Sequence, residues 1–311
     1  GFAGGNVFYD ALLLRVSTRE NLARASSLGF GLGYLGGGVL FTLNVLMTLN
    51  PAWFGLPDAT AAVKWSFVSV AVWWTVFSIP LFLFVAPGAQ STAPASRRAA
   101  GGMLAQVREG IAELIETLRE VRGRRVIWLF LLAYWLYIDG VHTIIRMAVD
   151  YGLSLGFEAN ALIVALLITQ FVGFPAALVF GWLGHRLGPK PGILIGISVY
   201  ALVTVWAFFM SVQWEFYALA VAIGLVQGAV QALSRSLYAS LIPPERSAQY
   251  FGFYNMLGKF AAILGPLLVG VVALATGSTR VSILSVVVLF AAGAWLLVRV
   301  PVSDATTQAS G

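Results

Sequence analysis

The chain is poor in the residues that most enzyme and metal sites require. Its 311 residues include no cysteine, two histidines and only 10% charged side chains. The lack of cysteine excludes disulfides, thiolate catalysis and thiolate-bound metals, and two histidines are too few for a histidine-rich metal site. There is also no HExxH motif, no His-x-x-x-His pair and no convincing acid dyad. We therefore predict no cofactor, no metal and no enzymatic activity.

The shortage of charge also decides the class of protein. A globular domain carries about 25% charged residues, so a soluble domain of this length is excluded. What the chain has instead is 59% hydrophobic residues and a mean hydropathy of +0.87. This composition predicts an all-α, polytopic membrane protein in the lipid bilayer. The net charge of +6 does not indicate a nucleic-acid partner, because the positions of the basic residues follow membrane topology instead.

Eight segments are apolar and long enough to cross a membrane. Each is near the roughly 20 residues that span about 30 Å of hydrocarbon. A short stretch before them, residues 2–14, resembles the end of a helix. The predicted spans cover residues 26–49, 65–86, 126–150, 159–184, 191–212, 214–234, 249–275 and 280–300.

Basic residues gather on one side of these spans. If the ends alternate, one side receives 15 of the 19 Lys and Arg residues, the other receives Lys64 and Arg280, and Arg146 and Lys259 fall within spans. The basic side is expected to be cytoplasmic. The central loop and the C-terminus are then cytoplasmic, and a bacterial inner membrane is the expected location.

The longest loop, residues 87–125, divides the chain. Its first part is rich in Pro, Ala and Ser and is interpreted as a linker. From Leu104 to Val121, apolar residues recur at spacings of three and four, which predicts an amphipathic helix on the cytoplasmic membrane surface. A soluble linker helix is the alternative.

An internal repeat supports this division. Two polar turns share one pattern, and each is followed by a Gly-rich span. The first contains Glu20, Arg24 and Ser27. The second contains Glu245, Gln249 and Gly252, at one constant displacement along the chain. Upstream, Tyr9-x-Ala-Leu resembles Tyr238-x-Ser-Leu. A repeat of the same orientation indicates two parallel halves. We predict the end of an N-terminal half (1–86), a cytoplasmic linker (87–125), a six-span C-terminal half (126–300) and a tail (301–311). Four further spans are expected before Gly1 in a twelve-span parent.

A loop motif points to a family. Residues 181–190, GWLGHRLGPK, resemble the G-x-x-x-D-R-x-G-x-[KR] motif of the major facilitator superfamily, and they fall between the second and third spans of their half, as in that family. The residues that carry the likeness are Gly181, Arg186, Gly188 and Lys190. His185 stands where the family has Asp, so the usual charge interaction of that Asp is in doubt.

A second series of motifs narrows the resemblance. It consists of QGAVQALSRSL at 227–237, YFGFY at 250–254, Gly258-Lys259, Leu264-Gly265-Pro266 and, upstream, Asp139-Gly140. Together they resemble the vacuole-effluxer-like branch of the superfamily, over residues 8–300. The resemblance implies a major-facilitator-type helical bundle and, from the fungal members, export of amino acids from the vacuole.

Ionisable residues inside the spans are the first candidates for a transport pathway. Asp139, His142 and Arg146 share one stripe of a predicted helix, and a charge at the centre of a span costs about 2.5–3.5 kcal/mol, so the stripe must face protein or water. Asp139 is the candidate proton site, or else a structural group that is neutralised by Lys259 or Arg146 or held in its neutral form by a raised pKa. Lys259 is expected at the same depth, paired or facing substrate.

The neighbouring candidates have equally ordinary alternatives. His142 could relay protons or only pack. Arg146 could bind a substrate carboxylate or pair with Asp150.

Polar residues of the C-terminal half complete the candidate set. Gln170, Gln227 and Gln231 either line a cavity or only join helices. Arg235 and Glu245 are expected to form a charge cluster that closes a gate or stabilises the cytoplasmic turn.

The function predicted from these residues is secondary transport of small polar solutes. Amino acids and coupling to protons are expected, and the expected partners are the solute, protons and the lipid bilayer, with no nucleic acid. A non-transporting membrane sensor or assembly protein that keeps the fold is the alternative. Neither the substrate nor the oligomeric state follows from the sequence.

Overall fold

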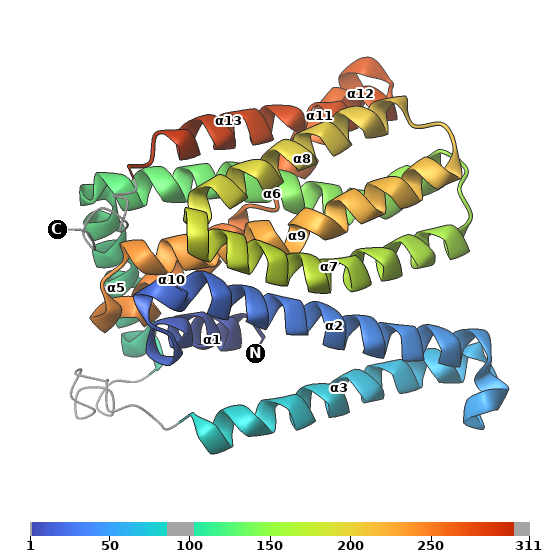
Figure 1. The fold of residues 1–311 in the computed structure, drawn as a ribbon, viewed down its shortest axis with the longest axis horizontal. Coiled ribbons are helices and arrows are strands. Elements are labelled where there is room, and N and C mark those ends of the chain that lie inside the picture. Colours follow the sequence, from blue (N-terminus) through green and yellow to red (C-terminus); the bar gives the residue numbers. More distant parts are fainter. Residues whose placement is uncertain (1, 86–102, 302–311) are drawn as a thin grey trace. The chain divides into compact units, whose positions relative to one another are not determined.

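The computed structural model describes residues 2–85 and 103–301, and this part of the chain is helical with no strand (Figure 1). Two compact units form, residues 1–34 with 110–311 and residues 35–109, and each is described by itself. The α-helices are α1 (Phe2–Val16), α2 (Leu22–Leu49), α3 (Ala59–Phe84), α5 (Met103–Gly123), α6 (Arg125–Ser154), α7 (Ala159–Leu187), α8 (Pro189–Phe209), α9 (Gln213–Leu241), α10 (Ser247–Phe260), α11 (Leu264–Thr276), α12 (Thr279–Leu284) and α13 (Val287–Val298), with short 3₁₀ helices η1 (Arg19–Asn21), η2 (Pro51–Phe54) and η3 (Pro244–Arg246).

Eight helical segments of the described chain are long and apolar enough to span a membrane, as predicted. Two of them are not continuous helices. The predicted span 249–275 consists of α10 and α11, separated at residues 261–263, and the predicted span 280–300 consists of α12 and α13. Both interruptions lie inside apolar sequence, so hydropathy alone does not reveal them.

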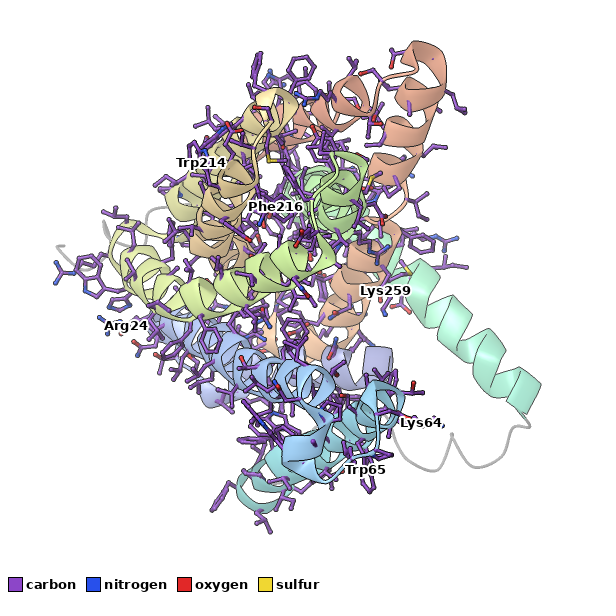
Figure 2. All side chains as sticks on the ribbon, turned by 90° about the vertical axis from the view of Figure 1, so that its right-hand side faces the viewer. Arg24, Lys64, Trp65, Trp214, Phe216 and Lys259 are labelled. Atoms are coloured by element: carbon purple, nitrogen blue, oxygen red, sulfur yellow. The ribbon has the colours of Figure 1, made fainter. Side chains whose placement is uncertain are left out.

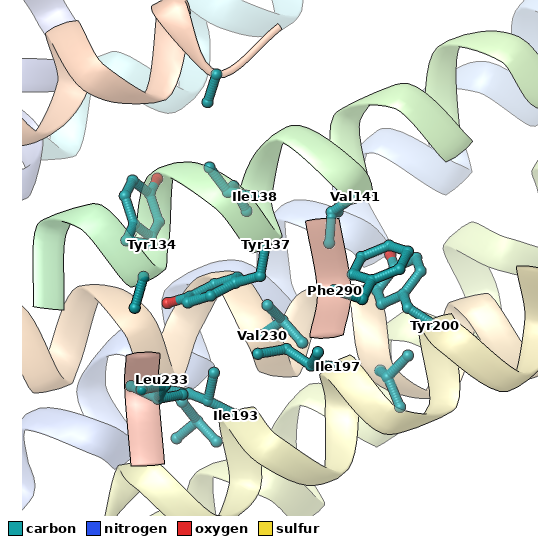
Figure 3. Close-up of a cluster of buried hydrophobic side chains, with 14 of the residues drawn as sticks. Tyr134, Tyr137, Ile138, Val141, Ile193, Ile197, Tyr200, Val230, Leu233 and Phe290 are labelled. Atoms are coloured by element: carbon teal, nitrogen blue, oxygen red, sulfur yellow. The ribbon is translucent and has the colours of Figure 1, made fainter. Parts of the chain in front are cut away.

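The larger unit has its core between α6, α8, α9 and α13. Tyr137 and Val141 of α6 face Ile197 of α8, Val230 of α9 and Phe290 of α13 (Figure 3). Two glycines permit this close approach. A Cβ on Gly140 would lie 2.7 Å from the Phe290 ring, and one on Gly293 would lie 2.8 Å from Cβ of Tyr137. Small residues at helix contacts are the expected device where lipid gives no hydrophobic drive for association.

The repeat is visible in the backbone of the larger unit. Helices α1 and α9 end at Val16 and Leu241, and the 3₁₀ helices that follow begin at Arg19 and Pro244. Helices α2 and α10 then begin at Leu22 and Ser247. Each of these pairs has the displacement that separates Glu20 from Glu245 in the sequence. Tyr9 and Tyr238 lie further apart than this, so their likeness is one helical turn out of register with the structure.

The smaller unit contains the rest of α2 with η2 and α3. The Asp58 carboxylate caps α3 by accepting from N–H of Ala61 at 2.7 Å, and the Ser69 hydroxyl donates to the side chain of Asn44 at 2.9 Å. Trp65, which is labelled in Figure 2, is one of its many exposed aromatic side chains, and Phe67 is another. Exposed aromatics on a long apolar helix fit contact with lipid.

The predicted amphipathic helix is α5. Near its C-terminal end Val121 is buried, and the Glu120 carboxylate accepts from Arg246 of η3 and from Arg124. This end is therefore held within the larger unit by side-chain contacts. The predicted place of the helix on the membrane surface stays a prediction. The predicted linker over 86–102 and the tail over 302–311 lie outside the described residues.

Candidate transport site

A buried ion pair joins α1 to α9. The Arg235 guanidinium donates from Nη1 to Oδ1 of Asp10 at 3.0 Å, and the two residues are 4% and 9% exposed. Nε of Arg235 also donates to the Ser26 hydroxyl at 2.9 Å, and that hydroxyl donates to the carbonyl of Ala232 at 2.7 Å. Removing one member of such a pair leaves an uncompensated buried charge, which costs about 3–5 kcal/mol.

The surroundings of this pair repeat the symmetry of the backbone. Asn255 donates to Oδ2 of Asp10 at 2.8 Å, and Phe30 lies with its ring centre 5.1 Å from the Arg235 guanidinium. At the displacement of the repeat, Asp10 corresponds to Arg235, and Phe30 corresponds to Asn255. The contact of Asp10 with Asn255 is thus the counterpart of the contact of Arg235 with Phe30.

Equivalent positions of two repeats can touch each other only near the axis that relates them. Asp10 and Arg235 are equivalent and in contact, so this ion pair marks the axis of the repeat. In transporters built from repeats, substrate and ion sites lie at the repeat interface.

A polar cavity of about 390 Å³ opens beside Arg235. Ligand sites usually measure about 300–1,000 Å³. Its walls combine the guanidinium with amide, phenol and glycine groups from α1, α2, α7 and α9. The lining residues are Tyr9, Gly29, Phe30, Gly33, Tyr34, Gln170, Gln231 and Arg235.

Two of the three predicted glutamines therefore meet Arg235 at one cavity, and the third does not. Gln227 lines a second, mainly apolar cavity between α6, α7, α8 and α9. It lies one turn before Gln231 on α9, near the phenol of Tyr34.

Asp139 occupies a different site, at the break between α10 and α11. It is fully buried, and its carboxylate accepts from the N–H of Leu264 at 3.0 Å and of Gly265 at 2.8 Å. These are the first N–H groups of α11, which have no partner within their own helix. An acidic group at a helix N-terminus is also favoured by the helix dipole. Asp139 on α6 is thus the cap of a helix that begins far downstream in the sequence.

The local sequence fits this cap. A Cβ on Gly265 would collide with the Thr143 hydroxyl and lie 2.8 Å from Oδ1 of Asp139, so only glycine fits. Pro266 lies in the first turn of α11, where a missing N–H breaks no helical hydrogen bond. The Thr143 hydroxyl donates to the carbonyl of Asp139 at 2.8 Å.

The other members of the predicted stripe are not gathered around Asp139. Arg146 and Lys259 are exposed in their unit, and Lys259 is labelled in Figure 2. Within the described chain neither forms an ion pair with Asp139 or with Asp150. His142 is half-buried, and its Nδ1 has no hydrogen-bond partner among the residues described. The carboxylate is held by backbone groups instead, which carry no signal in the sequence.

Comparison with known proteins places the chain in a family. The family model of vacuole effluxer Atg22-like proteins matches residues 15–310. The chain belongs to the Atg22-like vacuole effluxer family. This agrees with the resemblance drawn from the motifs.

Curated relatives occur in bacteria and fungi. The uncharacterized MFS-type transporter YxiO of Bacillus subtilis is 38% identical over 307 residues, which cover 98% of this chain and 70% of YxiO. Autophagy-related protein 22 of Yarrowia lipolytica is 28% identical, and the match covers 87% of this chain and 49% of the relative. Autophagy-related protein 22-1 of Aspergillus fumigatus is 27% identical, and the match covers 86% of this chain and 45% of the relative. The chain thus spans about half the length of these fungal relatives.

The loop motif of this Atg22-like chain connects α7 and α8 to their neighbours. Lys190 donates to the carbonyls of Val298 and Val300, both at 2.8 Å, and so caps the end of α13. Gly188 has a φ of +81°, which glycine adopts without strain, and it forms the turn between α7 and α8. The motif is therefore a structural joint in this chain.

His185, where the chain departs from the motif, contacts η1. Nδ1 of His185 lies 2.8 Å from the carbonyl oxygen of Glu20 in η1, and since a carbonyl only accepts, the imidazole donates there. Nearby, Gly181 packs on Ser27 of α2, where a Cβ would lie 2.9 Å from the hydroxyl. Arg186 is exposed with its guanidinium 4.4 Å from the ring centre of Trp182. His185 therefore connects the loop motif to η1.

Sequence reasoning missed half of the ion pair. Glu245, the expected neighbour of Arg235, is exposed in η3, whereas Asp10 is the observed partner. Asp10 was overlooked because α1 is too short to be recognised as a span. One signal was available, since Asp10 is an acid that precedes Arg235 by the displacement of the repeat and so occupies the equivalent place.

Proposed function

We propose that the protein is a secondary active transporter that moves small polar solutes, with amino acids as the expected class, by alternating access. The names of its relatives, an MFS-type transporter and vacuole effluxers, support transport as the general activity. Amino acids rest on the resemblance to the fungal branch. An integral, multi-pass position in a bacterial inner membrane, with the basic side in the cytoplasm, completes the proposal.

The ion pair of Asp10 with Arg235 is the observation that carries this proposal. Alternating access requires contacts between two halves that form in one state and separate in the other. This pair joins equivalent helices of the two repeats, close to their axis.

Coupling to protons is proposed at Asp139. It is buried inside a spanning helix, where ionisable groups are rare and mark ion pathways in transporters. A proton on this carboxylate would weaken its hold on the start of α11, and α10, which carries Asn255, would then be less constrained. Proton binding and the contact at the repeat axis are connected by this route.

Flux measurements on the complete protein test the proposal. The full-length protein is reconstituted in liposomes, and uptake of a labelled amino-acid mixture is measured with and without an imposed pH gradient. We expect uptake that the gradient accelerates, and loss of that acceleration in Asp139→Asn. Asp150→Asn, an exposed acid on the same helix, serves as the control. Absence of flux for every solute would support the alternative of a non-transporting sensor or assembly protein.

A further inference from the structure

The cavity beside Arg235 contains hydrogen-bonding groups that the protein itself does not use. Arg235 has five N–H donors. Three of them are directed to the Asp10 carboxylate and to the hydroxyl and carbonyl of Ser26. In the described chain, the side-chain amides of Gln170 and Gln231 have no hydrogen-bond partner, although both line the cavity. Both glutamines are partly buried, so the donors and acceptors of their amides are available to an occupant.

The charge of the site is balanced before any solute enters. The single cation of the cavity wall, Arg235, is neutralised by Asp10 at 3.0 Å. A solute with a net charge would therefore lose part of its hydration on entering and bring a charge that the cavity wall does not compensate, which is unfavourable. A solute without net charge adds none.

The shape of the site limits the occupant to a small molecule. The Tyr9 and Phe30 rings lie with their centres 5.2 and 5.1 Å from the guanidinium. The free guanidinium N–H groups and the two amides remain as the polar wall. Gly33 leaves open space, because an added Cβ would meet no atom within 4 Å.

We propose that this cavity is the solute-binding site and that the ion pair of Asp10 with Arg235 makes it selective for small polar solutes of zero net charge. The inference rests on the proposed transport function and assigns it a place and a selectivity. The solute's oxygen accepts from Arg235, and the amides of Gln170 and Gln231 bind its other polar groups. Removing the charge of Asp10 leaves a net positive site, which then favours anions.

Binding is measured by protection of a cysteine from a thiol reagent. The chain has no cysteine of its own, so Gly33→Cys in the full-length protein, with any cysteine outside this chain replaced, places one thiol at the cavity. Four probes share one skeleton of six heavy atoms and differ in charge. They are alanine (zwitterion), lactamide (neutral), lactate (anion) and alaninamide (cation).

Two controls separate local from general effects. Gly270→Cys lies on the exposed side of α11, where a Cβ also meets open space, and no probe should protect it. Gln231→Leu removes an amide of the cavity and should weaken protection, whereas Gln227→Leu, one turn away at the other cavity, should not.

The expected result is protection of Gly33→Cys by alanine or lactamide at concentrations about tenfold below those of lactate and alaninamide. In Asp10→Asn the order should change, with lactate improving about tenfold relative to alanine. An unchanged order in Asp10→Asn, or protection by no probe, would overturn the inference.

Flux is measured on the same preparations, so the two proposals fail separately. Transport of a probe that does not protect Gly33→Cys would place the binding site elsewhere and leave the transport function standing. Protection without transport would keep the site and refute the function. If Asp10→Asn fails to fold, the matched pair Gln231→Leu and Gln227→Leu still decides where the solute binds.

Discussion

Asp139 gives the sharpest test of how the broken span is held together. Replacing it by Leu removes the acceptor of two buried backbone N–H groups, those of Leu264 and Gly265. Each buried donor left without a partner costs about 1–3 kcal/mol, so Asp139→Leu should lower the free energy of unfolding by about 2–6 kcal/mol. Asp139→Asn keeps one carbonyl oxygen at the same place and should lower it by about 1 kcal/mol, which is typical of a weakened helix cap.

The measurement is equilibrium unfolding in mixed micelles, followed by circular dichroism and by tryptophan fluorescence. Asp150→Leu is the matched control, since Asp150 is exposed on the same helix, and it should change the free energy of unfolding by less than about 0.5 kcal/mol. If Asp139→Leu is as stable as the control, the carboxylate does not hold α11. If Asn and Leu destabilise equally, the negative charge, and not the position of an acceptor, is what the break requires.

Three further predictions concern the contacts that join the helices. Gly265→Ala should lower the free energy of unfolding by about 2 kcal/mol or more, because the added methyl collides with a buried hydroxyl of α6. Gly270→Ala, in open space within α11, should instead stabilise the helix by about 0.5–1 kcal/mol. Equal effects in the same unfolding assay would contradict the packing at the break. Lys190→Met should cost about 1 kcal/mol, since the last carbonyls of α13 lose their donor, and hydrogen exchange should rise at the end of α13 and not elsewhere. Asp10→Ala and Arg235→Ala should each cost about 3–5 kcal/mol, but the double variant should cost less than their sum, because no charge is then left unpaired; additive costs in this double-mutant cycle would show that the ion pair is not coupled.

The sequence motifs are explained by the contacts that they make. Asp139-Gly140 and Leu264-Gly265-Pro266 are far apart in the sequence, yet they form one joint, in which the acid caps the helix that the second motif begins. The series at 227–237 provides Gln231 and Arg235 to the cavity, and α10 provides Asn255 to the carboxylate of Asp10. The motifs that carry the family resemblance therefore consist of residues that form contacts between helices.

Part of the candidate site could be predicted, and the missing part has a physical reason. Gln170 and Gln231 were recognisable because polar residues in apolar spans must find a polar environment, whereas Arg235 was expected beside Glu245 at the cytoplasmic turn. Their arrangement was not predictable, since a side chain on one helix carries no information about which helix packs beside it. The hydrogen-bond partners of Asp139 were still harder to predict, because they are backbone N–H groups that a break in a helix leaves without helical partners.

Composition and spacing alone determined the class of this protein, its eight spans, the accumulation of basic residues on one side and the displacement of the repeat. These properties depend on the length of apolar runs and on residues close in sequence, which each segment specifies by itself. Only the tertiary structure decided that Arg235 pairs with Asp10 and not Glu245, that Asp139 caps α11 and is not paired with Lys259, and that two spans are interrupted. Those outcomes depend on which helix surfaces meet, and in a membrane that choice is made by close packing of small residues and by polar pairing between segments far apart in the chain.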